Sequence, residues 1–263
     1  MAVHAYNMDI SGKVALVTGG ANGIGKAIVE MLLRKEAKGV GIVDIDSING
    51  QEVAASLQKT FGDERVVFVK CDVTSNEQLK SAFEDIKNNF GRLDIVCNNA
   101  GIGNEYEHVK TIATNLIPVI TGTYLAVEFM GTQNGGNGGV VINTGSVFGI
   151  IANRNLPVYS ASKYGVVGFT RAVAKEPNVE ENGVRVSAVC PGLVDTGMVA
   201  KLKEKLQGKT LLQPSYIAEV VVKLIEEAKY NGCVCLASGE NAMTAVEEPD
   251  IPYGRMLNCS WQL

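Results

Sequence analysis

The sequence predicts an α/β fold: a single doubly wound, Rossmann-type domain with a parallel sheet of about seven strands and helices on both faces. Short valine- and isoleucine-rich runs alternate with longer amphipathic stretches, which predicts strands joined by helical crossovers. The runs are continuously apolar, as is typical of strands buried on both faces. Polar or glycine-rich clusters follow most of the runs, so we expect them to meet at the carboxyl ends of the strands, where such sheets bind ligands.

The alternation of strand and helix patterns continues from residue 13 to residue 236. No internal repeat or linker marks a second domain, so we expect one domain spanning residues 1–263. The predicted strands are 13–18, 40–44, 65–69, 93–97, 140–143, 184–189 and 233–236. The predicted helices are 24–38, 53–61, 78–90, 109–130, a helix from Pro157 that ends before Pro177, and 215–229.

Composition excludes several classes of function. The net charge is −4 and no basic patch is present, so we expect no nucleic-acid partner. Residues 1–11 lack the basic and apolar regions of a signal peptide, and we expect no membrane span and a cytoplasmic location. Six cysteines in 263 residues are not a disulfide framework, and with only two histidines we predict no metal site.

A glycine-rich turn follows the first predicted strand. Its spacing is Gly19-x-x-x-Gly23-x-Gly25, and a helix is predicted to start within it. Such a turn lets the backbone approach a pyrophosphate at the helix N-terminus, although an ordinary glycine turn is the alternative. Asp44 ends the second strand, 19 residues after Gly25, where an acid can bind the ribose 2′-hydroxyl of NAD. We therefore predict NAD over NADP, with Lys26 as the one basic residue that would favour a phosphate.

The third strand is followed by Cys71-Asp72-Val73. The Asp72 carboxylate is a candidate contact for the adenine of the cofactor. The alternative is that it belongs to the N-cap region of the next helix, ahead of Glu77.

The candidate catalytic pair is Tyr159 and Lys163, at the start of the helix that follows Pro157. Residues four apart share a helix face, so both side chains would point into one site. A nearby ammonium favours the phenolate and would make the tyrosine a usable base. Tyr106 and Lys110 have the same spacing, but no serine ends a strand ahead of them, whereas Ser146 precedes Tyr159 by thirteen residues. We expect Tyr106 and Lys110 to be a solvated helix start.

Together these motifs resemble the short-chain dehydrogenase/reductase family in its classical branch, over residues 13 to about 236. The matching residues are Thr18, Gly19, Gly23, Gly25, Asp72, 98–101, Asn115, Ser146, Tyr159, Lys163, Pro191 and Gly192. Within the family, the stretches 122–125, 133–136 and 165–171 are most similar to the group of NAD-dependent 15-hydroxyprostaglandin dehydrogenases.

The resemblance implies a role for each matching residue. Tyr159 would be the general base, Ser146 would hold the substrate oxygen, and Lys163 would lower the tyrosine pKa and bind the nicotinamide ribose. Asn115 would stabilise the helix around the site and a proton-relay water. The implied cofactor-binding residues are Gly19, Asn22, Gly23, Ile24, Gly25, Asp44, Ile45, Cys71, Asp72, Val73, Asn99, Ala100, Gly101, Tyr159, Lys163, Pro191, Gly192, Val194 and Thr196. A homodimer or homotetramer is also implied.

By the same resemblance, substrate choice lies in the loops 147–156 and 193–214, with the tail 247–263 as a candidate cover for the pocket or a subunit interface. We expect Ser146, Phe148, Leu156 and Tyr159 to line the substrate site. In the prostaglandin enzymes a glutamine stands where this chain has Leu156, which makes the pocket more apolar. Arg154 and the basic run 201–209 are candidates for binding a substrate carboxylate, but a solvated surface is the favoured interpretation of both.

The expected activity is oxidation of a secondary alcohol to a ketone on an apolar substrate, with a hydroxy-eicosanoid first and a steroid, terpenoid or other apolar alcohol second. A catalytically silent NAD-binding interaction module is the alternative from another class. The presence of Ser146, Tyr159 and Lys163 together argues against it, because a binding module needs none of them.

Overall fold

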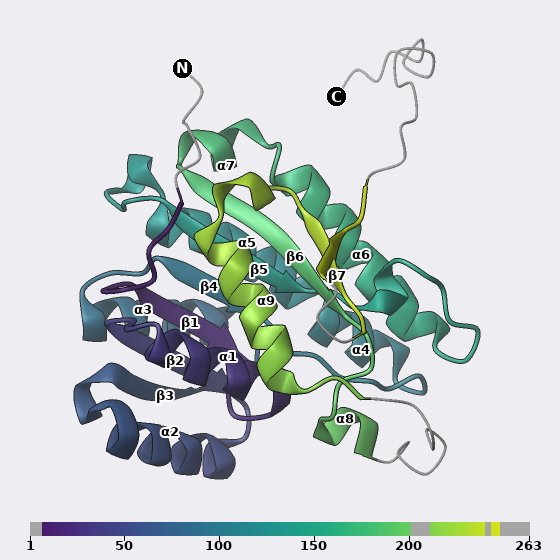
Figure 1. The fold of residues 1–263 in the computed structure, drawn as a ribbon, viewed down its shortest axis with the longest axis horizontal. Helices are drawn as coiled ribbons and strands as arrows, with labels where there is room; N and C mark the ends of the chain where they lie inside the picture. The colour runs from purple at the N-terminus through teal and green to yellow at the C-terminus, as the bar shows by residue number, and fades with distance from the viewer. Residues whose placement is uncertain (1–6, 201–210, 240–242, 248–263) are drawn as a thin grey trace.

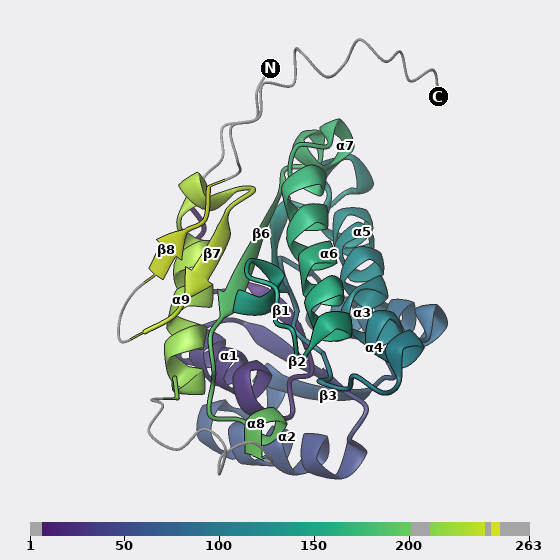
Figure 2. The same cartoon turned by 90° about the vertical axis from the view of Figure 1, so that its right-hand side faces the viewer.

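A computed structural model describes residues 7–200, 211–239 and 243–247. They form one eight-stranded sheet in the order β3-β2-β1-β4-β5-β6-β7-β8, with helices on both faces (Figures 1 and 2). The strands are β1 (Val14–Thr18), β2 (Gly39–Asp44), β3 (Val66–Lys70), β4 (Ile95–Asn98), β5 (Gly139–Thr144), β6 (Val184–Pro191), β7 (Val234–Ala237) and β8 (Met243–Ala245). The predicted α/β fold is confirmed.

The helices of the described residues pack in two layers. The longer ones are α1 (Gly23–Arg34), α2 (Ser47–Phe61), α3 (Asn76–Phe90), α4 (His108–Asn115), α5 (Ile117–Met130), α6 (Pro157–Val173) and α9 (Pro214–Glu226), and the short ones are α7 (Pro177–Glu181) and α8 (Gly197–Ala200). In Figure 2 the sheet separates α1, α2 and α9 from α3, α4, α5 and α6.

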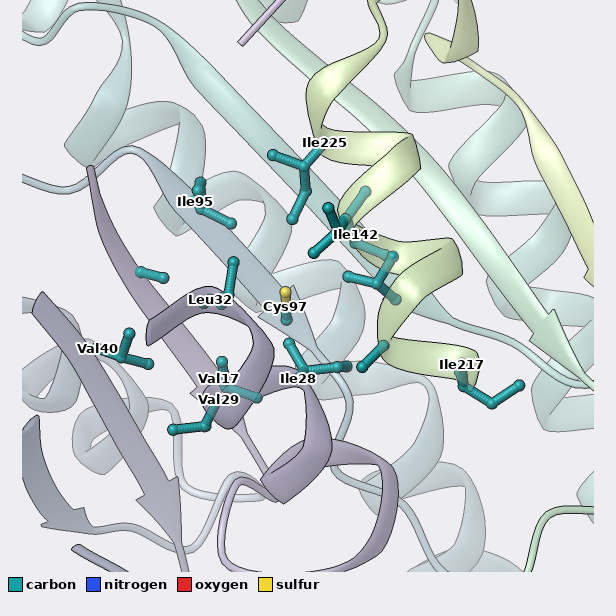
Figure 3. Close-up of a cluster of buried hydrophobic side chains, with 14 of the residues drawn as sticks. Val17, Ile28, Val29, Leu32, Val40, Ile95, Cys97, Ile142, Ile217 and Ile225 are labelled. Carbon is teal, nitrogen blue, oxygen red and sulfur yellow. The ribbon is translucent and has the colours of Figure 1, made fainter. Parts of the chain in front are cut away.

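Each layer buries its own apolar face on the sheet. On one side, Ile28 and Leu32 of α1 and Ile217 and Ile225 of α9 meet Ile142 and other strand residues (Figure 3). A second cluster fills the other side, where side chains of α3 and α5 pack on the opposite face of the same strands. Since both faces are covered, β1, β4, β5 and β6 are buried along their whole length, which fits the apolar runs that predicted them.

The structure adds short helices that were not predicted, α7 and α8, and corrects the prediction at the edge of the sheet and within 109–130. The sheet has an eighth strand, β8, which pairs antiparallel with β7; at three residues it was too short to predict. The helix predicted over 109–130 is two helices, α4 and α5, which meet at Leu116. Pro118 explains the break, because it has no N–H for the preceding turn and its ring clashes with that turn.

The stretch His108–Met130 is long and apolar enough to cross a membrane by length and composition, with a mean hydropathy of 1.3. We had expected no stretch of that kind. In the structure it is the broken pair α4 and α5, and α5 packs Leu125, Ala126 and Met130 into the core. The apolar composition of α5 is therefore explained by its place against the sheet.

The chain runs outward from β1 to β2 and β3 and then returns to place β4 on the other side of β1. The strand order thus reverses between β1 and β4. Ligands of open parallel sheets bind in the crevice at this reversal, beyond the carboxyl ends of the strands. The glycine-rich turn follows β1 and the 98–101 motif follows β4, so both predicted cofactor segments lie at that crevice.

Candidate active site

The glycine-rich turn after β1 is packed so closely that side chains are excluded. A Cβ on Gly25 would lie 2.0 Å from the carbonyl oxygen of Gly19, and a Cβ on Gly19 would lie 2.9 Å from Cα of Ala100. Gly19 and Gly23 also have positive φ angles of 64° and 50°, a region that L-residues seldom occupy. Helix α1 begins at Gly23, so its N-terminus opens on this turn.

Hydrogen bonds join this turn to the loop after β4. The hydroxyl oxygen of Thr18 accepts from the backbone N–H groups of Asn99 (2.9 Å) and Ala100 (3.1 Å). The Asn99 amide donates in turn to the carbonyl oxygens of Thr18 and Gly19. These hydrogen bonds hold the two loops together at the crevice where the strand order reverses. We call the space beside them the cofactor groove.

Asp44 ends β2 beside the same turn, where the sequence placed it. Its carboxylate accepts hydrogen bonds from the backbone N–H of Ala21 (3.0 Å) and that of Asp46 (3.0 Å). The next residue, Ile45, is 61% exposed, so its side chain presents apolar surface next to the carboxylate.

The other predicted cofactor residues lie around this groove. A Cβ on Gly23 would lie 3.0 Å from the Thr196 methyl carbon, so the segment after β6 crosses the glycine-rich turn. Val194 is buried and pairs with Leu212, which ties that segment to the start of the chain leading to α9. Pro191 is the last residue of β6, and Gly192 N–H donates to the carbonyl of Ala237.

The segment after β3 differs from the second interpretation that we considered. Ser75, not Asp72, is the N-cap of α3 and accepts from Gln78 N–H. The Asp72 carboxylate accepts from the N–H and the hydroxyl of Thr74, and Asp72 is partly exposed to solvent. Cys71 and Val73 are buried in the core beside it.

Tyr159 and Lys163 lie on the first two turns of α6, which begins at Pro157 as predicted. The Lys163 ammonium lies 5.7 Å from the centre of the Tyr159 ring. Lys163 as a whole is buried, with 3% of its surface exposed. Its one described hydrogen bond runs to the carbonyl oxygen of Thr144, at 2.8 Å. Burial lowers the pKa of Lys163 to about 8 from 10.5, because no carboxylate offsets the lost hydration.

Ser146 follows β5 and reaches the same point. Ser146 is the N-cap of a short 3-10 helix, η3 (Val147–Gly149). Its hydroxyl oxygen accepts from the N–H of Phe148 at 3.1 Å. Burial raises the pKa of the Tyr159 phenol, and the nearby Ser146 hydroxyl lowers it by a smaller amount. We had expected Lys163 to bring the tyrosine pKa down; in the protein alone, burial dominates and the net direction is up.

Asn115, the last residue of α4, connects the loop after β4 to the catalytic helix. Its amide oxygen accepts from Ile102 N–H (2.8 Å), and its amide nitrogen donates to Ile102 O (2.9 Å) and to the Ser162 hydroxyl (3.2 Å). A Cβ on Gly101 would lie 3.3 Å from the Asn115 amide oxygen and 3.6 Å from the Lys163 nitrogen. Asn115, Gly101 and Lys163 thus meet at one point.

The chain matches the short chain dehydrogenase family over residues 13–207. It belongs to that family. Over 243 residues it is 43% identical to 15-hydroxyprostaglandin dehydrogenase [NAD(+)] of Bos taurus, a match that covers 86% of this chain and 91% of the relative. The human enzyme of the same name is 42% identical with the same coverage. Among solved structures, levodione reductase superimposes with a TM-score of 0.77 at 28% identity, covering 87% of this chain and 97% of that one.

The sequence pattern missed two residues at this short chain dehydrogenase's site. Cys190, the penultimate residue of β6, is buried with its sulfur 2.6 Å from where a Cβ on Gly145 would lie, directly before Ser146, and burial raises the pKa of its thiol to about 11. Glu105, in the loop after β4, binds the first turn of α6. No motif in the sequence assigned Cys190 to the site, and nothing in the chain near Glu105 indicates its distant partner.

Tyr106 and Lys110, which have the same spacing as Tyr159 and Lys163, lie on the surface as we expected. Tyr106 is 97% exposed, and Lys110 forms an exposed ion pair with Glu107 at 3.7 Å. Neither residue approaches the groove through any described contact.

The two loops predicted to select the substrate are described in part. Phe148 and Leu156 are half-buried, and Arg154 is exposed. The loop after β6 contains the short helix α8, where only a loop was predicted. The basic run 201–209 and residues 248–263 of the tail lie outside the described residues. Glu247 is described, and its carbonyl accepts from Arg171 of α6 at 3.3 Å.

Proposed function

We propose that this short chain dehydrogenase uses NAD to oxidise a secondary alcohol to a ketone on an apolar substrate, with a hydroxy-eicosanoid such as a prostaglandin as first choice. The main support for this proposal is that Ser146, Tyr159 and Lys163 lie together at the crevice that the glycine-rich turn also borders. The relatives named 15-hydroxyprostaglandin dehydrogenase [NAD(+)], at 42–43% identity, support the substrate and the cofactor.

The groove fits a dinucleotide. Its glycines keep side chains away from the N-terminus of α1, so a pyrophosphate could approach the backbone there. Asp44 stands at the end of β2, where a carboxylate accepts from a ribose 2′-hydroxyl and repels a 2′-phosphate. When bound there, NAD supplies the hydride acceptor, and the protein supplies position and electrostatics.

The side chains of the site handle the substrate oxygen and its proton. The Ser146 hydroxyl lies near enough to the Tyr159 phenol to lower its pKa, so an alcohol oxygen placed between them could donate to one and accept from the other. Tyr159 takes the proton as the carbon gives up its hydride. The Lys163 ammonium, one turn away, favours the phenolate that this step requires. Asn115 holds the loop wall against the same helix.

The second candidate substrate class is a steroid, terpenoid or other apolar alcohol, and Leu156 favours it. This half-buried leucine precedes Pro157 and offers no hydrogen bond to a polar chain on the substrate. Apolar contact alone discriminates weakly between lipids of similar width.

The test is a panel of prostaglandins, hydroxysteroids and terpenols with NAD, followed by NADH absorbance at neutral and alkaline pH. We expect turnover to be fastest on a hydroxy-eicosanoid; fastest turnover on a steroid or terpenol would shift the assignment to the second class. Absence of turnover on every alcohol, and on the matching ketones with NADH, would instead favour a silent NAD-binding module.

Tyr159→Phe is the matched variant for the chemistry. It removes only the hydroxyl, so we expect kcat to fall by roughly 10³-fold or more while the Kd for NADH changes by less than about threefold. A comparable loss of NADH binding would show that Tyr159 acts in cofactor binding instead.

Two further features remain part of this proposal. Membership of the family supports a homodimer or homotetramer, which sedimentation of the purified protein would test. It also supports a cytoplasmic location, which fractionation of cells expressing the full chain would test.

A further inference from the structure

The first turn of the catalytic helix is capped by a residue from a distant part of the chain. Helix α6 starts with Leu156 at its N-cap, and that side chain has no oxygen to accept a hydrogen bond. Pro157 has no N–H, so Val158 and Tyr159 carry the first unpaired donors of the helix. Both donate to Glu105: Val158 N–H to Oε2 at 2.9 Å and Tyr159 N–H to Oε1 at 2.8 Å.

The carboxylate is itself held in place. Its loop is anchored on one side by Asn115, which makes two hydrogen bonds to the backbone of Ile102. On the other side, the Asn104 amide oxygen accepts from the N–H groups of Tyr106 and Glu107. Glu105 is half-buried between these two anchors. We call the two hydrogen bonds from Val158 and Tyr159 to Glu105 the clasp. The clasp joins the loop after β4 to the first turn of α6.

The same loop borders the substrate side of the site. A Cβ on Gly103 would lie 3.6 Å from the Met198 side chain of α8, so the loop spans from the segment after β6 to the start of α6. A shift of this loop would move the Tyr159 backbone directly, because one oxygen of Glu105 binds its N–H.

We propose that Glu105 is a positioning residue of the reaction: its carboxylate fixes the first turn of α6 and with it the Tyr159 hydroxyl relative to Ser146. The inference rests on the proposed function. It assigns a role in that chemistry to a residue that contacts Tyr159 only through the backbone.

The charge of the carboxylate has a second, separable effect. A helix N-terminus carries a partial positive charge, which favours a phenolate nearby, and Glu105 offsets it. Among the described residues, the other ionisable groups beside Tyr159 are the Lys163 ammonium, 5.7 Å from its ring, and the buried Cys190 thiol of β6. Removing the negative charge at Glu105 would leave the N-terminal charge uncompensated and lower the pKa of the phenol. The alkaline rise of alcohol oxidation, which follows phenolate formation, would then move to lower pH.

The experiment compares Glu105→Ala, Glu105→Gln and Glu107→Gln in the full chain. Glu107 is the matched control, two residues along the loop, and its exposed carboxylate contacts Asn104 and Lys110 but no part of α6. We expect kcat to fall about 10- to 100-fold in Glu105→Ala, less in Glu105→Gln, which keeps one acceptor oxygen, and less than twofold in Glu107→Gln. The KM for NAD should stay within about twofold in all three.

The pH profile separates positioning from a loss of folding. In Glu105→Gln we expect the midpoint of the alkaline rise in kcat/KM to move down by about half a unit, with no shift in Glu107→Gln. Unchanged kcat in Glu105→Ala or an equal loss in the control would overturn the inference, and a midpoint that does not move in Glu105→Gln would refute the charge effect.

Amide hydrogen exchange gives a readout that does not depend on turnover. The peptide covering 157–163 should exchange at least about tenfold faster at Val158 and Tyr159 in Glu105→Ala, and at the wild-type rate in Glu107→Gln. Wild-type exchange in Glu105→Ala refutes the clasp whatever the activity. A wild-type enzyme that oxidises no alcohol refutes the proposed function, and the exchange result still decides whether Glu105 holds the helix.

Discussion

Replacing Lys163 with methionine is expected to make the protein more stable at pH 7 while destroying its activity. The ammonium is buried and no carboxylate contacts it within the described structure; its described hydrogen bond runs to the carbonyl oxygen of Thr144. In the proposed function this charge favours the Tyr159 phenolate, and its burial costs folding free energy. Methionine has a similar length and no charge, so it removes that cost.

The size of the gain follows from the pKa of the lysine. Its value is about 8 in the folded protein against 10.5 for a free side chain, a difference worth about 3 kcal/mol of folding free energy. A depressed lysine pKa opposes folding fully below pH 8, and the cost disappears as pH rises through 10.5. Methionine leaves the Thr144 carbonyl without its partner, which costs about 1 kcal/mol. The net expectation is a gain of about 2 kcal/mol at pH 7 that shrinks to near zero by about pH 10.

Urea denaturation at pH 7 and pH 10, without nucleotide and at one protein concentration, measures this directly. Lys26→Met is the control, since Lys26 is an exposed residue 3.9 Å from Glu30, and it should change stability by less than about 0.5 kcal/mol at either pH. A Lys163→Met protein that is less stable than wild type at pH 7, by an amount that does not vary with pH, would refute the reasoning.

Three further predictions concern the cofactor groove and the substrate loop. Asp44→Ala removes the carboxylate expected to bind the ribose and should lower the kcat/KM ratio of NAD to NADP by roughly 10- to 100-fold; an unchanged ratio would mean that Asp44 is not the selector. Gly25→Ala places a Cβ 2.0 Å from the Gly19 carbonyl, so the turn must move, and the Kd for NADH measured by fluorescence should rise at least about tenfold. If binding is unchanged, the turn is more tolerant than its packing indicates. Arg154→Ala should raise the KM for acidic lipids alone, and an equal effect on neutral alcohols would exclude a role in carboxylate binding.

Most of the fold was predictable because its strands are buried on both faces. Residues 14–17 and 140–142 are apolar without interruption, and few other structures place such runs between amphipathic helices. The eighth strand was not predictable from three residues whose pairing depends on β7. Pro118 could have shown the break in 109–130, but the apolar residues around it continue in phase, and only the packing of α4 and α5 separates them.

The sequence by itself determined the chemistry available at the site. Ser146, Tyr159, Lys163 and the glycine-rich turn stand at positions that a doubly wound sheet brings to one edge, and the resemblance to the family implied the role of each. Tertiary structure alone decided the energetics. The lowered pKa of Lys163 arises from burial without a counter-charge, and the cap on α6 comes from Glu105, more than fifty residues away. Neither could be inferred from sequence, because solvent exclusion and long-range hydrogen bonds depend on where the folded chain places its distant segments.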